Sequence, residues 1–207
     1  MLLKFTSQDM FDTALVDVST GQTAFRLVTD VISGPSSSAA PVRRQTEIRD
    51  GADALLGTID WIGRVPDNIH LLGEHIGGLV NLFASNTIQF IPKEISIPTR
   101  FDTEYLWTAT PDALYLLDYD SDTRKAQLHT HAPALKQTHP PVPGRGATYL
   151  ELAPDPLSLA PPVEILVSLL MLDILRRGRF RLPAYAFAAP SRLQRAWTLL
   201  RPRRNTV

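Results

Sequence analysis

The chain has 207 residues, with 21 basic and 21 acidic residues, 44% hydrophobic residues and no cysteine. These values describe an ordinary globular protein that is long enough to bury a sizeable core, and they argue against disorder throughout. The lack of cysteine excludes disulfides, cysteine-ligated zinc, iron–sulfur clusters and thiol chemistry, and it fits a cytoplasmic location. We expect one domain over residues 1–190, followed by a basic tail over residues 191–207.

Short alternating or β-branched runs, bounded by turn residues, predict strands from the N-terminus onward. We expect strands at residues 2–5, 13–18, 23–31, 42–49, 54–62, 69–72, 87–91, 104–109, 113–119, 125–131 and 147–153. Residues 33–41 and 132–146 are rich in serine or proline and predict loops. Pro66-Asp67-Asn68 predicts the end of a strand unit, and Gly77-Gly78 predicts a tight bend.

One apolar helix follows these strands, and we expect it at about residues 162–177. Its central run, residues 163–175, is shorter than the ~20 residues of a membrane span and contains Glu164 and Asp173, so no transmembrane segment is expected. The two acids point to opposite sides, so the helix must be enclosed on nearly every side, with an acid near each end of the enclosure. The pattern predicts a mainly β fold: a closed β-barrel of about 10–12 strands enclosing this hydrophobic helix.

Five segments stand out in the order of elements: T-A-L-V-D-V-S-T-G-Q-T-A-F-R-L-V-T (13–29), A-L-L-G-T-I-D-W-I (54–62), E-Y-L-W-T-A (104–109), A-L-Y-L-L-D-Y (113–119) and L-L-M-L-D-I-L-R-R-G-R (169–179). Their order and hydrophobic pattern resemble those of a family of fungal proteins. That family, catalogued as a domain of unknown function, is similar to the tubby C-terminal, LURP-one-related and phospholipid-scramblase-like group, and the resemblance covers about residues 11–179. It implies a tubby-like barrel of about a dozen strands around a C-terminal helix.

Relatives in that wider group bind phosphoinositides or act at membranes, which makes anionic lipid a ligand to consider. No lysine/arginine pair of this chain matches a phosphoinositide site residue by residue, and a scramblase-type cysteine cluster is absent from the sequence. Fold alone does not carry function from one protein to another.

Charge is divided unevenly along the chain. Residues 1–173 have a net charge of −9, and the nine arginines after them, with no acid, contribute +9. Within residues 191–204 a short helix would place Trp197 on an apolar stripe beside arginines, as in a membrane-surface anchor. The same stripe could dock on the protein itself, or the tail could be disordered. The candidate contacts for an anionic surface are Arg192, Arg195, Trp197, Arg201, Arg203 and Arg204.

Other motifs are weaker. His129 and His131 would face the same side of a strand and are the candidate ligands of a metal-dependent enzyme or hydrolase. Residues 140–145 fit P-x-x-P-x-R, which SH3-type grooves recognise, so an adaptor that presents this loop is a further alternative. Asp118-Tyr119-Asp120-Ser121-Asp122 begins like a calcium loop, but Thr123 stands where glycine is required.

No nucleophile elbow, phosphate loop or dinucleotide fingerprint is present in the sequence, so we assign no catalytic, cofactor-binding or metal residue. The leading hypothesis is a non-enzymatic intracellular binding or scaffold domain that contacts anionic lipid or a protein partner, in the cytoplasm or at a membrane periphery. Nucleic acid is not an expected partner, because the body is acidic and the aromatic residues are not interleaved with basic ones. The oligomeric state stays open.

Overall fold

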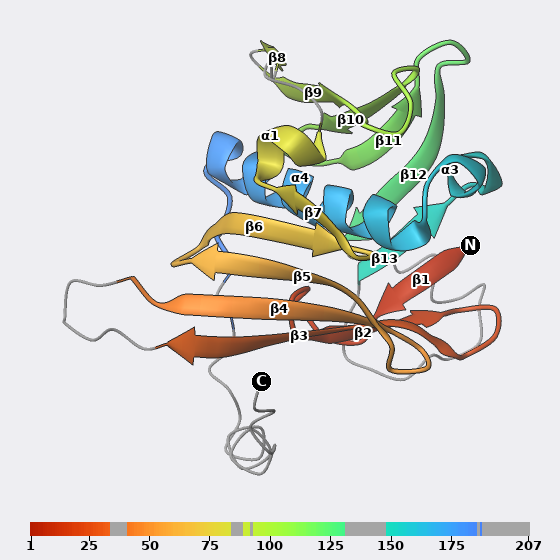
Figure 1. The fold of residues 1–207 in the computed structure, drawn as a ribbon. Coiled ribbons are helices and arrows are strands. Elements are labelled where there is room, and N and C mark those ends of the chain that lie inside the picture. The colour runs from red at the N-terminus through yellow and green to blue at the C-terminus, as the bar shows by residue number, and fades with distance from the viewer. Residues whose placement is uncertain (34–40, 84–88, 92, 131–147, 186, 188–207) are drawn as a thin grey trace.

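The structure is a computed structural model, and it describes residues 1–33, 41–83, 89–91, 93–130, 148–185 and 187 (Figure 1). Its strands are β1 (Leu2–Phe5), β2 (Thr13–Asp17), β3 (Thr23–Ser33), β4 (Arg43–Asp50), β5 (Leu55–Ile62), β6 (Val65–Leu71), β7 (Glu74–Gly77), β8 (Gln89–Ile91), β9 (Glu94–Pro98), β10 (Tyr105–Ala109), β11 (Leu114–Asp118), β12 (Thr123–Thr130) and β13 (Thr148–Leu152). The helices are α1 (Leu79–Leu82), α3 (Pro154–Leu159) and α4 (Pro162–Phe180).

All thirteen strands belong to one antiparallel sheet, in the order β7-β6-β5-β4-β3-β2-β1-β13-β12-β11-β10-β9-β8. Strands that follow one another along the chain are neighbours in each half of the sheet, as expected for hairpins and meanders. The two halves meet where β1 lies between β2 and β13, with Leu3 opposite both Asp17 and Leu150. The mainly β prediction is therefore confirmed.

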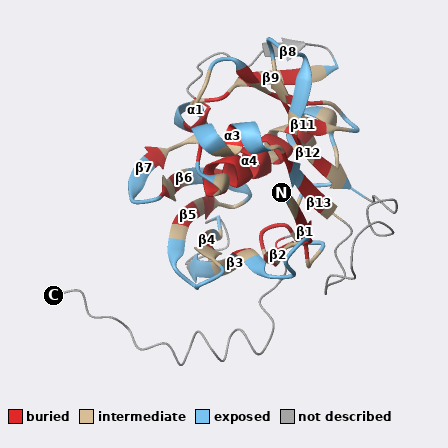
Figure 2. Cartoon of the chain, turned by 90° about the vertical axis from the view of Figure 1, so that its right-hand side faces the viewer, coloured by how far each residue is buried: buried red, intermediate tan, exposed pale blue. Residues whose placement is uncertain are grey.

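Helix α4 forms the centre of the molecule. Its residues from Ile165 to Leu172 are all buried, and α4 packs against β6, β10 and β11. Figure 2 views the molecule from the side where α4 begins and shows strands curving around the buried helix. The helix extends three residues beyond the predicted end at 177, because Phe180 still packs against the core and the left-handed Arg181 (φ 54°) ends it.

The predicted closed barrel is not confirmed, because β7 and β8 are the two edges of the sheet and do not pair with each other in the described residues. Strand β7 is only four residues long and ends at Gly77, which has a positive φ of 81°. The chain then leaves the sheet and enters α1, which lies between β7 and β9 in both views (Figures 1 and 2).

One local prediction is wrong, and two strands, β7 and β9, were not predicted. Pro66-Asp67-Asn68 lies inside β6 rather than at its end, because a register shift between Asp60 and Trp61 accommodates the irregular segment. The chain folds back at Leu72-Gly73, both with positive φ, so that Glu74–Gly77 forms β7, and the predicted bend at Gly77-Gly78 follows this strand. Strand β9 was not predicted, although Ile95 and Ile97 alternate with polar residues and are fully buried.

Candidate functional site

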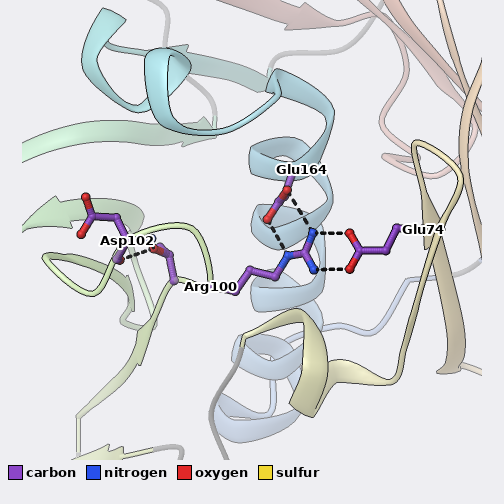
Figure 3. A network of polar contacts seen from close by, with 5 residues as sticks. Glu74, Arg100, Asp102 and Glu164 are labelled. Carbon is purple, nitrogen blue, oxygen red and sulfur yellow. Dashed lines mark hydrogen bonds and ion pairs between the residues drawn. The ribbon is translucent and has the colours of Figure 1, made fainter.

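The two acids of α4 lie at opposite ends of its buried stretch, and each contacts arginine. Glu164, in the first turn, accepts from Arg100 Nε at 2.7 Å, and the same guanidinium donates to both oxygens of Glu74 at 3.0 Å. Figure 3 shows Arg100 between the two carboxylates. The turn that presents Arg100 is fixed by hydrogen bonds between Thr99 and Asp102.

We call the ion-pair cluster of Glu74, Arg100 and Glu164 the clasp, because it links three elements of the fold. Arg100 follows β9, Glu74 begins β7 and Glu164 belongs to α4, so one guanidinium joins the edge strand β7 and the turn after β9 to the core helix. The hydrogen bonds to Glu74 and then to Glu164 raise the pKa of Arg100, and Arg100 lowers the pKa of Glu74. Two carboxylates therefore occupy the guanidinium, which makes this cluster a poor ligand site.

The other acid, Asp173, is fully buried near the C-terminal end of α4. It lies 2.7 Å from Arg176 Nη2 and 2.7 Å from Arg177 Nε, and it accepts a hydrogen bond from the Tyr185 hydroxyl. Arg177 Nη1 also donates to the Pro183 carbonyl at 2.6 Å, and its guanidinium lies 4.2 Å from the Tyr185 ring centroid. Burial, followed by the charge of Asp173, raises the pKa of Tyr185 well above its ordinary value. The segment after α4 is thus fixed against the helix end.

A pocket of about 230 Å³ lies between this returning segment, the helix end and the β5–β6 turn. Its walls are mostly apolar, and two guanidinium groups are included in them. The lining residues are Arg64, Ile174, Arg177, Gly178, Leu182, Ala184, Tyr185 and Phe187. Phe187 closes one side, since its ring packs 5.1 Å from that of Trp61 and lies 5.2 Å from the Arg44 guanidinium.

Three exposed arginines lie at the element ends and turns on this side of the fold, and Arg64 among them lines the pocket. Arg43, Arg64 and Arg181 are exposed, and no other described residue forms an ion pair with them. Arg177 shares the single carboxylate of Asp173 with Arg176, so that group of three charges is net positive. The C-terminal end of α4 and the adjacent sheet end are therefore basic.

Large aliphatic side chains are exposed at the same sheet end. Val31, Ile32 and Val65 are 43%, 59% and 65% exposed. Register places them close together, because Arg43 pairs with both Ser33 and Ile62, and Ile62 pairs with Val65. In Figure 1 the ends of β3 and β5, the starts of β4 and β6 and the C-terminal end of α4 all lie on the left. We call this surface, defined by Val31, Ile32, Arg43, Arg64, Val65 and Arg181, the basic end.

Most of the residues singled out in the sequence lie elsewhere. Arg192, Arg195, Trp197, Arg201, Arg203 and Arg204 lie outside the described residues, as do residues 140–145 and His131. His129 contacts Glu151 at 2.8 Å, and the described part of the chain contains no group of three or more histidine, aspartate or glutamate side chains placed to hold a metal. Asp118 accepts backbone N–H bonds from Asp120 and Ser121 within its turn.

Sequence reasoning missed the basic end because its residues come from four separate segments. One signal was present: Arg43, Arg64 and Arg181 lie next to turns or at element ends, where arginine has no role in packing. No helix in the described residues has both the length and the apolarity needed to cross a bilayer. Comparisons with family models, curated proteins and solved structures give no match to this chain.

Proposed function

We propose that this protein is a non-enzymatic intracellular binding domain that docks on anionic membrane lipid through its basic end. One observation carries the proposal: Arg43 and Arg64, which form no ion pair with another described residue, lie beside the exposed side chains of Ile32 and Val65. Aliphatic side chains that enter the interface, together with arginines at the level of the head groups, are the combination that peripheral proteins use on anionic bilayers. The fungal family resemblance, with its lipid-binding wider group, supports the same ligand class.

The distribution of charge around the basic end agrees with this proposal. Asp30, Asp60 and Asp67 lie one or two residues further along the strands, and the described residues give none of them an ion pair with an arginine of the basic end, while Gln45 donates to Asp60 at 2.8 Å. Each arginine near an anionic bilayer contributes about 1 kcal/mol of binding free energy. The tail after Phe187 adds five arginines and no acid, so its charge favours the same surface.

The proposal is tested by co-sedimentation with phosphatidylcholine vesicles that do or do not contain phosphatidylserine or a phosphoinositide. The chain should bind only the anionic vesicles, and Arg43→Glu/Arg64→Glu should lower the affinity about thirtyfold or more, on the basis of about 1 kcal/mol per arginine. Arg26→Glu/Arg124→Glu makes the same change of charge away from the basic end and should bind as the natural chain does. Comparing the full chain with a chain that lacks residues 191–207 measures how much the tail contributes to vesicle binding. Negligible binding by both the full and the shortened chain would overturn the proposal.

The two alternatives gain no support from the described residues. His129 contacts an exposed glutamate and no further candidate ligand, and the proline-rich loop lies outside the described part. Neither a metal-dependent enzyme nor an adaptor is therefore proposed.

A further inference from the structure

The pocket at the C-terminal end of α4 has mostly apolar walls and two arginines in its lining. Ile174, Leu182 and the Phe187 ring supply apolar walls, while Arg64 and Arg177 are the charged residues among the described part of its lining. An apolar cavity with a few convergent charged groups is the usual form of a small-molecule site. We propose that it holds the alkyl chain of a single-chain anionic amphiphile, an alkyl phosphate, whose phosphate pairs with Arg64, while Arg177, already bonded to Asp173 and to the Pro183 carbonyl, adds positive charge to the wall. This inference goes beyond the proposed function: it concerns a ligand at the same end of the molecule and has a test of its own.

Volume restricts the ligand. About 230 Å³ is less than the roughly 300–1,000 Å³ of pockets that enclose drug-sized molecules. A two-chain lipid is too large for such a space, whereas part of one unbranched alkyl chain fits it. The head group then remains at the mouth, where Arg64 is exposed.

Charge selects the head group. No carboxylate lines the pocket, and Asp173, the nearest acid bonded to its wall, is fully buried and shared by Arg176 and Arg177. Guanidinium groups bind phosphate oxygens through paired, charge-assisted hydrogen bonds. The same positive charge disfavours the chain's own tail as the occupant, because residues 188–207 contain five arginines and no acid.

The walls are held in place before any ligand binds. Arg177 is fixed by Asp173 on one side and by the Pro183 carbonyl on the other, and Tyr185 is fixed by Asp173. Phe187 packs against the rings of Phe11 and Trp61. A preorganised site loses less entropy on binding, which favours a small ligand of limited contact area.

The test is calorimetric titration of the full chain with octyl phosphate, with inorganic phosphate, octyl glucoside and octyltrimethylammonium as separate probes. Saturable binding of octyl phosphate is expected, at least tenfold tighter than that of any other probe. Arg64→Gln should weaken it tenfold or more, because a charge-assisted hydrogen bond is lost. Equal binding of octyl glucoside would overturn the anionic part of the inference, and equal binding of inorganic phosphate would overturn the alkyl part.

A blocking variant separates this inference from the membrane proposal. Gly178 lines the pocket from α4, and a Cβ added there meets no atom within 4 Å, so Gly178→Leu fills the space without a backbone clash. Gly178→Leu should lose octyl phosphate binding, whereas Gly178→Ala should keep it, and both should still sediment with anionic vesicles. Absence of octyl phosphate binding by the natural chain would overturn the pocket inference even where vesicle binding is intact. Loss of vesicle binding alone would overturn only the membrane proposal.

Discussion

Arg100 forms ion pairs with two carboxylates, and these partners differ in their surroundings. The side chain of Glu164 is 9% exposed, whereas that of Glu74 is 59% exposed. Removing one member of a buried pair leaves its partner charged and without compensation, which destabilises a protein far more than the loss of a surface pair. The strength of the clasp therefore depends mainly on Glu164.

Arg100→Met should lower the free energy of unfolding by about 3 kcal/mol, the lower end of the range for breaking a buried pair, because Arg100 retains some exposure. Glu74→Gln should cost clearly less, since it removes only the exposed partner. Urea denaturation followed by circular dichroism measures both. Equal losses in the two variants would show that Glu164 does not dominate the clasp.

The clasp also predicts how stability responds to acid. Hydrogen bonding to Arg100 lowers the pKa of Glu74 below its ordinary value of 4.5 in the folded state. The carboxylate therefore stabilises the folded protein at pH values above 4.5, and this contribution is lost as the pH falls through the lowered pKa. Urea midpoints measured across that window should decline more steeply for the natural chain than for Glu74→Gln. Parallel curves would contradict the prediction.

At the scale of elements, α4 is the core of the fold, and its enclosure can be tested directly. Leu170 is fully buried in the middle of the helix, so Leu170→Asp should abolish folding, because an unpaired charge cannot be buried there. Leu159→Asp, on the 46% exposed Leu159 of α3, should cost less than about 1 kcal/mol. A soluble Leu170→Asp variant that melts cooperatively would show that the helix is not enclosed.

Two glycines should respond oppositely to the same substitution. Gly178 is helical with open space beside it, so Gly178→Ala should stabilise the protein by about 0.5–1 kcal/mol. A Cβ on Gly57 in β5 would lie 2.5 Å from the His70 carbonyl oxygen, so Gly57→Ala should destabilise it by about 1–3 kcal/mol. Thermal melts of both variants check the signs, and a change of the same sign in both would be the contrary result.

The sequence allowed prediction of those elements whose side chains repeat with a clear period. Helix α4 and the alternating strands such as β5 could be located because burial follows local pattern. The edge strand β7 could not be predicted, because the chain folds back into it through the positive φ of Leu72. Leucine is not a residue type that indicates a positive φ. The basic end could not either: Arg43, Arg64 and Val65 become neighbours only through sheet register, whereas the tail arginines were conspicuous because they are close in sequence.

For the whole molecule, both halves of the sheet share α4, so they should unfold together. Trp61 reports on the β1–β7 half and Trp107 on the β8–β13 half, and both are buried. In chains that retain only one of these tryptophans, with the others changed to phenylalanine, the fluorescence midpoint should coincide with the far-ultraviolet circular dichroism midpoint. Separate midpoints in either chain would show that the halves are independent units.

The position of β1 between β2 and β13 has a consequence for synthesis of the chain on the ribosome. At about 5–20 residues per second, roughly 7–30 s pass between the emergence of β1 and that of its partner β13. Helix α4, which covers the inner face of the sheet, is made later still. Throughout that interval the nascent strands expose leucine and isoleucine side chains together with the edge of β1 that later pairs with β13, so we expect chaperones to bind the growing chain before translation ends.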